Sequence, residues 1–263
     1  MKKLSFLFIS LLAVTLFTSC NKDDEAVSRQ TVNMTINNRA IDGEQVVFSQ
    51  GTAKVELNYI DKTIKFTTDY NDIDGVPHSI ITPDMKMTPV SSSVYEFTSS
   101  NGNQVGSLTG GTFSGYIDMS TGMTWYTINS GSMEVVSTSH LLYAYSTTDI
   151  TNPDNDNHGS HQHSAYLFAL DSKGETCILQ ISNFIPNLNG TVEAQEVQYN
   201  GLTVTPTATG YKITSEEAES SYKGFFKLTD VDFTLNEQCM VIDGSFKCND
   251  LEFKVTGNLF PED

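Results

Sequence analysis

Two parts of this chain carry the same features in the same order, and together they decide the fold. LTVTPTATGYKITS (202–215) is followed by QCMVIDGSFKCN (238–249), and earlier MKMTPVSSSVYEFTS (85–99) is followed by WYTINSGSMEVV (125–136). In both parts a Thr-Pro pair precedes an aromatic residue and then a Gly-centred hairpin. The period of roughly 115 residues is too long for a solenoid unit and suits a duplicated domain. The repeat therefore predicts two related β modules in tandem.

Hydrophobic periodicity supports strands throughout. Val231, Phe233 and Leu235 alternate with Asp232 and Thr234, as in a strand with one buried and one solvated face. Short runs of this kind recur between Gly, Asn and Asp turn signals, and we find no convincing amphipathic helix. We therefore expect an all-β protein of two tandem antiparallel β-barrel or sandwich modules.

The N-terminus has the features of an export signal. Lys2 and Lys3 precede an apolar run, and the small residues Thr18 and Ser19 precede Cys20. The segment LFTSC resembles a bacterial lipobox, and this resemblance implies cleavage before Cys20 and attachment of a lipid to its thiol. An ordinary signal peptide that happens to precede a cysteine is the alternative.

These features predict how the chain is divided. We expect a lipoprotein signal peptide over 1–19, an acidic tether over 20–29, a first β-barrel-like module over 30–149, a His/Asp/Asn-rich linker over 150–163 and a second β-barrel-like module over 164–263.

The charge balance narrows the range of partners. The chain has 32 Asp and Glu against 15 Lys and Arg, a formal net charge of −17. Such a surface repels phosphate backbones, so nucleic acid is not an expected partner. A membrane contact would come from the lipid anchor.

Two of the four cysteines are predicted to face each other. If Asp243-Gly244 is a two-residue type I′ turn, Cys239 lies opposite Cys248 in a non-hydrogen-bonded pair with Cα atoms about 4.5 Å apart. That separation is at the low end for a disulfide. Two buried thiols are the alternative, and Cys177 is expected to be an unpaired buried thiol.

A cluster of histidines is the sharpest candidate for a metal site. His158, His161 and His163 lie together beside Asp154 and Asp156. Neutral imidazoles at this spacing can bind Zn²⁺ or another transition metal. A solvated, His-rich linker is the alternative. We expect no other cofactor.

No catalytic pattern is present in the sequence. It lacks a G-x-S-x-G elbow, an H-E-x-x-H motif and a phosphate-binding glycine loop. We therefore predict that the protein is not an enzyme and assign no catalytic residue.

Several segments carry a resemblance to a known family. The acidic run NKDDE (21–25) after Cys20 resembles the export tag of surface lipoproteins of Bacteroidota-type bacteria. The meander that ends in GSFKCNDLEFKVTG (244–257) resembles the calycin-like, or lipocalin-like, β-barrel domains common in those lipoproteins. The resemblance implies tandem barrels on an outer membrane lipoprotein that faces the cell exterior.

The expected function is binding. A small hydrophobic ligand, a glycan or a host protein is the expected partner, and a structural or adhesive role without a small-molecule site is the alternative. The first module is rich in Met and aromatic residues, which could line a ligand site or fill the core. If one module binds, the first is favoured, but the pattern assigns no ligand-binding residue.

Overall fold

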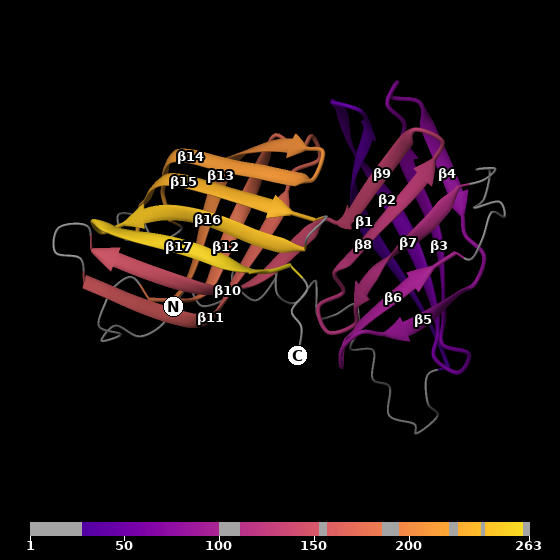
Figure 1. Cartoon of the computed structure of the whole chain (residues 1–263), viewed down its shortest axis with the longest axis horizontal. Helices are drawn as coiled ribbons and strands as arrows, with labels where there is room; N and C mark the ends of the chain where they lie inside the picture. Colours follow the sequence, from indigo (N-terminus) through magenta and orange to yellow (C-terminus); the bar gives the residue numbers. More distant parts are fainter. Residues whose placement is uncertain are drawn as a thin grey trace, which may run out of the picture. The chain divides into compact units, whose positions relative to one another are not determined.

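The computed structural model describes residues 28–99, 111–152, 157–185, 195–220, 226–237 and 240–259. Within these ranges the regular structure consists of antiparallel strands without a helix, so the all-β prediction is confirmed. Accordingly, none of the described residues belongs to a helix that could cross a membrane. The chain divides into two compact units, Met1–Ala40 with Gly51–Ser139 and Ile41–Gln50 with His140–Asp263 (Figure 1).

The first barrel is a nine-stranded sheet in the order β2-β1-β9-β8-β7-β6-β5-β3-β4. An additional pairing of β2 with β3 closes it into a ring. β4 and β5 pair with β3 one after the other, along the edge opposite β2. The strands are β1 (Arg29–Asp42), β2 (Gln45–Asn58), β3 (Thr63–Asn71), β4 (Pro77–Ile81), β5 (Met85–Pro89), β6 (Val94–Thr98), β7 (Thr112–Asp118), β8 (Thr124–Ser130) and β9 (Met133–Ser139).

The second barrel is a closed ring of eight consecutive strands, and its first strand pairs with its last. The strands are β10 (Leu141–Asn152), β11 (Asn157–Leu170), β12 (Thr176–Phe184), β13 (Gln195–Thr207), β14 (Gly210–Ala218), β15 (Leu228–Asn236), β16 (Val241–Cys248) and β17 (Leu251–Asn258). Two tandem modules are thus confirmed.

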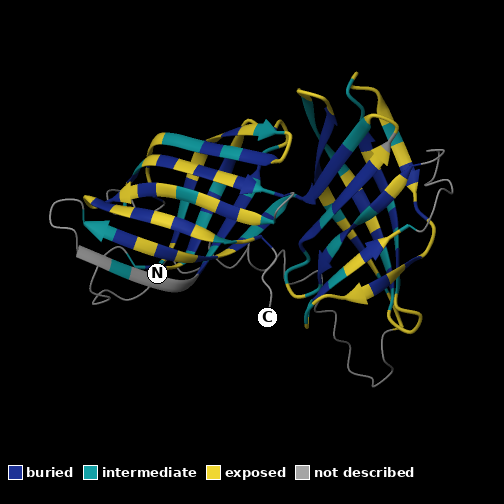
Figure 2. Ribbon diagram, viewed as in Figure 1, coloured by how far each residue is buried: buried dark blue, intermediate teal, exposed yellow. Residues whose placement is uncertain are grey.

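Aromatic side chains fill the interior of the first barrel. The alternation of buried and exposed residues along each strand, visible in Figure 2, directs one face inward. Phe66 lies 5.0 Å from Phe97, 5.2 Å from Phe113 and 5.2 Å from Tyr126, measured between ring centroids. All four rings are almost completely buried. They give this barrel a solid core.

The second barrel is filled in the same way. Phe246 stacks on Phe253 at 4.8 Å and lies 6.0 Å from Phe233. Phe233 in turn contacts Phe168 edge-on at 5.4 Å, and Phe184 lies 5.5 Å from Phe253. Aromatic rings from five strands therefore meet in the interior of this barrel.

Each core also contains one buried tyrosine hydroxyl with a threonine partner. In the first barrel Tyr126 Oη lies 2.6 Å from Thr68 Oγ1, and in the second Tyr166 Oη lies 3.0 Å from Thr148 Oγ1. Burial raises the pKa of Tyr126 to about 12 and raises that of Tyr166 as well. Both hydroxyls therefore stay neutral at physiological pH.

The Thr-Pro part of the sequence repeat is structurally equivalent in the two barrels. Pro89 at the end of β5 faces Tyr95 on β6, and Pro206 on β13 faces Tyr211 on β14. In both cases the proline is the penultimate or final pairing before the hairpin turn. This equivalence supports the predicted duplication.

The Gly-centred hairpin was wrongly placed in the second copy. Asp243 and Gly244 lie in the middle of β16, where they pair with β15 and β17. The turn instead contains Asn249 and Asp250, which have positive φ values of 51° and 63°. Positive φ at both central residues is the type I′ pattern, and Asn and Asp tolerate it.

This register removes the basis of the predicted disulfide. Val241 and Cys248 stand at opposite ends of one strand, about 23 Å apart at the usual rise per residue. Cys248 is a buried free thiol that pairs across the strands with Leu228 and Leu251, and Cys239 lies outside the described residues. Cys177 is a buried free thiol, as predicted.

The predicted domain boundary is also wrong. Residues 150–163 do not link two modules, because β10 and β11 pair from Leu141 with Ala169 to Asn152 with Asn157, with one register shift between Ser146 and Thr148. Both strands belong to the second barrel. The first barrel ends at Ser139, ten residues before the predicted end of the first module at 149.

Two hairpin turns share one side-chain design. Asp72 Oδ1 accepts hydrogen bonds from the amides of Asp74 and Val76, at 3.0 and 2.8 Å. Asp171 Oδ1 accepts from the amides of Glu175 and Thr176, at 2.9 and 3.3 Å. Such side-chain bonds to nearby amides satisfy the backbone of a turn without a partner strand.

Candidate functional site

The Met-rich composition of the first barrel allowed either an interior ligand site or a filled core. Met85, Met87 and Met123 are buried core residues of the first barrel. Among the described residues, aromatic rings meet at the centre of each barrel, and these methionines are buried with them. The hollows of interest lie on the outer walls.

One hollow lies over β5, β6, β7 and β8 of the first barrel, and we name it the aromatic groove. It has a volume of about 280 Å³, close to the lower limit for small-molecule sites. Its lining consists of Lys86, Thr88, Glu96, Phe97, Thr98, Ser114, Gly115, Tyr116 and Trp125.

Strand register brings most of this lining together. Thr88 faces Glu96, Glu96 faces Tyr116, and Tyr116 faces Trp125, so the four form one continuous rung across the sheet. Thr98 and Ser114 face each other on the neighbouring outward rung. At a strand spacing of about 4.8 Å, four strands span about 14 Å, enough for a short oligosaccharide.

The ring pair Tyr116 and Trp125 forms one end of the rung. The ring centroids lie 5.8 Å apart with planes inclined by 36°. Both side chains are only partly buried. The indole Nε1 of Trp125 is shielded from solvent and has no hydrogen-bond partner in the described part of the chain. Partly exposed rings of this kind offer apolar faces, and a buried donor favours the arrival of an acceptor.

A glycine lets the strands approach beneath these rings. Gly115 points inward, opposite Phe97 and Tyr126. A Cβ atom there would overlap the carbonyl oxygen of Trp125 and come within 2.6 Å of the Cα of Tyr126. The position therefore requires glycine for the close passage of β7 beside β8.

The charged groups of the aromatic groove are available to a ligand. Lys86 and Glu96 are exposed, and neither forms an ion pair or hydrogen bond with another described residue. Elsewhere on the same barrel, by contrast, Lys54 Nζ lies 2.8 Å from Glu56 Oε1. The aromatic groove thus combines an apolar platform with one donor and one acceptor that have no partner in the described chain.

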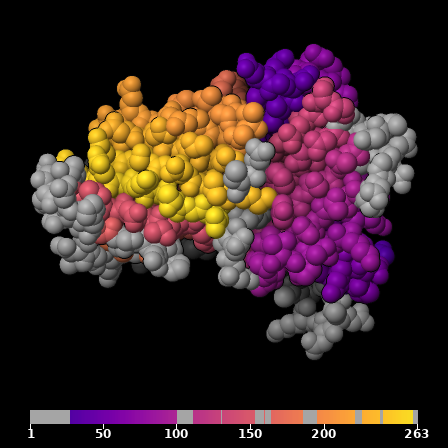
Figure 3. Space-filling view, in the orientation of Figure 1, coloured from indigo at the N-terminus to yellow at the C-terminus, as the bar shows by residue number. Residues whose placement is uncertain are grey.

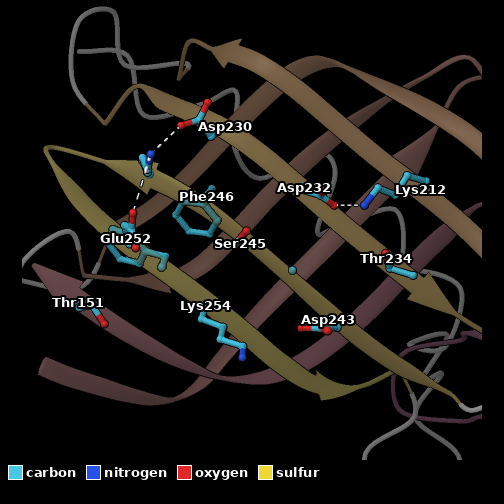
Figure 4. A pocket seen from close by; sticks show the side chains of 13 residues that line it. Thr151, Lys212, Asp230, Asp232, Thr234, Asp243, Ser245, Phe246, Glu252 and Lys254 are labelled. Atoms are coloured by element: carbon cyan, nitrogen blue, oxygen red, sulfur yellow. Dashed lines mark hydrogen bonds and ion pairs between the residues drawn. The ribbon is translucent and has the colours of Figure 1, made fainter. Parts of the chain in front are cut away.

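A larger hollow lies on the outer wall of the second barrel, and we name it the charged groove (Figure 4). It has a volume of about 650 Å³. Its lining comes from β10, β14, β15, β16 and β17 and consists of Thr151, Lys212, Asp230, Asp232, Thr234, Asp243, Gly244, Ser245, Phe246, Lys247, Glu252, Phe253 and Lys254.

Most charges of this groove pair with one another. Lys247 Nζ lies 2.9 Å from Asp230 Oδ2 and 3.9 Å from Glu252 Oε1, and Lys212 pairs with Asp232. The hydrogen bond to Asp230 raises the pKa of Lys247. These side chains are roughly half exposed, and such surface pairs contribute little free energy. The charged groove is therefore a solvated wall in which Lys212 and Lys247 pair with carboxylates, whereas Asp243 and Lys254 have no partner among the described residues.

The predicted site residues do not meet in either groove. His158, His161 and His163 belong to β11, and the backbone of β11 pairs His158 with Thr151 and His161 with Thr148. Their side chains lie outside the described set, so the zinc site stays a prediction. Among the side chains that are described, no cluster of three potential metal ligands occurs. Cys20 likewise lies outside the described residues.

The residues of the aromatic groove were missed by sequence reasoning. Ser114 and Tyr116 alternate with Phe113 and Ile117, which does indicate their outward direction. Their assembly with Glu96 and Trp125 depends on the register of two hairpins. The sequence alone gives no such register.

The comparisons with known proteins leave the family open. Neither a protein-family model nor a curated protein matches the sequence. Among solved structures, a presumed outer membrane protein from Bacteroides fragilis is 14% identical and is similar over 86% of this chain and 96% of its own, with a TM-score of 0.34. Similarity at this level carries no inference about function. The calycin-like resemblance therefore stays a prediction.

Proposed function

We propose that the protein is a non-enzymatic binding protein that holds a glycan in the aromatic groove of the first barrel. We further propose that a lipid on Cys20 anchors it to the outer membrane with the barrels facing the cell exterior. Of the three expected partners, a glycan fits the groove best. A small hydrophobic ligand would need an interior cavity, and aromatic rings fill the interior of each barrel.

The observation that carries this proposal is the rung of Glu96, Tyr116 and Trp125. Sugar rings present C–H faces that pack on aromatic faces, and hydroxyl groups that need donors and acceptors. The two partly exposed rings supply the apolar platform. Glu96 can accept from sugar hydroxyls, and Lys86 can donate to them.

The structural or adhesive alternative is favoured by a different observation, the filled interior of each barrel. A structural role does not account for the aromatic pair on the outer wall, which lies beside two charged groups without partners in the described chain. A host protein that carries a glycan would engage the same groove.

A glycan array probed with the purified full-length chain tests the proposal directly. Trp125 is the only tryptophan, so its fluorescence also reports titration with each bound oligosaccharide. We expect Trp125→Ala to weaken binding at least about tenfold, which corresponds to 1.4 kcal/mol. We expect Glu96→Gln to weaken it less, because the amide oxygen still accepts a hydrogen bond. The affinities of the variants are measured by calorimetry.

Tyr145→Ala is the matched control, since Tyr145 is an exposed aromatic residue on β10 of the second barrel. It should leave glycan affinity unchanged. An array without any bound glycan, or a Trp125→Ala variant that binds like the unmodified chain, would overturn the proposal.

A further inference from the structure

One end of the first barrel is the end at which the described chain begins, and we name it the entry end. The amide of Tyr59, in the β2–β3 turn, donates to the carbonyl of Ser28 at 3.0 Å, just before β1. The β5–β6 and β7–β8 turns meet through a backbone hydrogen bond, in which Met119 N donates to Ser93 O at 2.9 Å.

Strand β5 connects the β5–β6 turn to the β2–β3 turn at this end. The amide of Met87 donates to the carbonyl of Lys62 at 2.8 Å, so β5 runs past this turn toward its own turn at Val90. Three turns and the start of β1 therefore lie at one end of the barrel.

Apolar side chains project from this end. Ile60 is 75% exposed, Val90 52% and Tyr59 39%. The turn residues around them are largely uncharged, because residues 91–93 are all serine and residues 120–121 are serine and threonine. The adjacent pair Asp61 and Lys62 has opposite charges. The entry end thus exposes three apolar side chains among uncharged polar residues and is close to neutral.

The opposite end of this barrel differs in charge. The β3–β4 turn carries Asp72 and Asp74, and β9 begins beside Glu134 after the β8–β9 turn. In a chain with a formal net charge of −17, the entry end is the part of the barrel that an anionic lipid surface repels least.

The N-terminal segment connects this end to the predicted anchor. Cys20 precedes the first residue of β1, Arg29, by a segment whose fully extended length is roughly 30 Å. An anchor on Cys20 therefore keeps the entry end within that distance of the bilayer. Apolar turn residues held near a membrane partition into its interface, and tyrosine is enriched there.

We propose that the entry end is a membrane-docking surface, on which Ile60 and Val90 enter the headgroup region of the bilayer that holds the lipid on Cys20. This inference rests on the anchor in the proposed function and is independent of the glycan. It fixes the orientation of the first barrel, with the acidic β3–β4 turn directed away from the membrane.

Tryptophan quenching by brominated phosphatidylcholine tests the orientation. The lipidated full-length chain is reconstituted in vesicles as Ile60→Trp in a Trp125→Phe background. Val76→Trp in the same background is the matched control, because Val76 is 50% exposed in the β3–β4 turn at the opposite end. We expect brominated lipid to reduce the emission at position 60 at least twofold and to leave the emission at position 76 unchanged.

Equal quenching at the two positions, or quenching at neither, would overturn the docking surface. Only vesicles recovered by flotation are measured, and the mass of the Cys20 peptide reports the lipid. Absence of the lipid would overturn both the anchor and the docking surface, whereas failure to bind a glycan would leave the quenching result unaffected. If Trp125→Phe disturbs the fold in circular dichroism, Trp125 is retained and its signal is subtracted.

Discussion

The outer walls of the two barrels are built alike and differ in what they leave available to a ligand. In the aromatic groove, Glu96 and Lys86 have no partner among the described residues, and they lie beside Tyr116 and Trp125. In the charged groove, Lys212 and Lys247 are both bound to neighbouring carboxylates. The charged groove is the larger of the two, at about 650 Å³ against about 280 Å³.

The difference teaches that the larger hollow is not the one that exposes an aromatic pair. Cross-strand charge pairs stabilise a sheet locally and use part of the hydrogen-bonding capacity of their groups. A wall with unpaired polar groups and exposed rings leaves both for a ligand. The two barrels are similar scaffolds, and the partly exposed pair of Tyr116 and Trp125 lies on the first.

The largest expected effect comes from removing a core ring in either barrel. Phe113→Ala should destabilise the first barrel by about 4 kcal/mol, and Phe246→Ala should destabilise the second by a similar amount, because each opens a cavity among aromatic rings. Urea unfolding followed by Trp125 fluorescence reports the first barrel, and far-ultraviolet circular dichroism reports both. If Phe246→Ala shifted the fluorescence transition as much as Phe113→Ala, the barrels would unfold as one unit.

The second largest loss of stability should come from replacing an inward-facing glycine, and the loss should differ between the two barrels. Gly115→Ala places a methyl group against backbone atoms of β8, so we expect a loss of about 3 kcal/mol. At Gly244 two of the three nearest atoms belong to the side chain of Phe233 and not to the backbone, so Gly244→Ala should cost less, about 1.5 kcal/mol. Urea midpoints of the two variants, each measured against the unmodified chain, give the comparison. Equal losses would contradict this ranking.

The buried tyrosine hydroxyls should have a smaller effect. Tyr126→Phe removes the 2.6 Å hydrogen bond to Thr68 and should cost about 1 kcal/mol. Because burial raises the pKa of Tyr126 to about 12, the loss should be constant from about pH 6 to about pH 9 and should shrink above it, since the unfolded tyrosine ionises near pH 10 while the folded one stays neutral. Fluorescence-detected unfolding across this range measures it. Tyr166→Phe is the matched change in the second barrel and is followed by far-ultraviolet circular dichroism. A loss that grows toward pH 10 would show that the hydroxyl ionises earlier.

The turn carboxylates should give the smallest effect. The hydrogen bond from His78, at 2.8 Å, and those from two backbone amides lower the pKa of Asp72 below 3.8. Its contribution to stability is therefore fully present above the unfolded pKa and is lost as the pH falls through the lower folded pKa. We expect Asp72→Asn to lower the fluorescence-detected midpoint at pH 7 and to match the unmodified chain in strong acid.

Asp171→Asn is the control for this turn, since Asp171 holds the corresponding turn of the second barrel without a histidine partner. It should leave the Trp125 transition unchanged at every pH. A difference between Asp72→Asn and the unmodified chain that persists in strong acid would show that the carboxylate charge is not its cause.

The features that follow from local pattern could be predicted from the sequence. Alternation predicted the all-β class, and the Thr-Pro repeat predicted two modules, because each depends on neighbours along the chain. The burial of Met85 and of Cys177 followed for the same reason.

The features that depend on register could not be predicted. Asp243-Gly244 and Asn249-Asp250 are both good turn sequences, and pairing with β15 and β17 decides between them. A shift of one residue exchanges the two faces of a strand, so the rung from Glu96 to Trp125 has no signature in the sequence. The predicted linker was wrong for a similar reason, because Asn and Asp residues occur at hairpin turns as well as at domain boundaries.

Closure of the second barrel has a consequence for when the protein can fold. Tyr145 on β10 pairs with Asn258 on β17, roughly 110 residues later, so the ring is completed by contacts of high sequence separation. Until β17 (Leu251–Asn258) is available, β10 and β16 each have an unpaired edge. This barrel therefore completes its fold only after β17 has emerged, about 110 residues after β10.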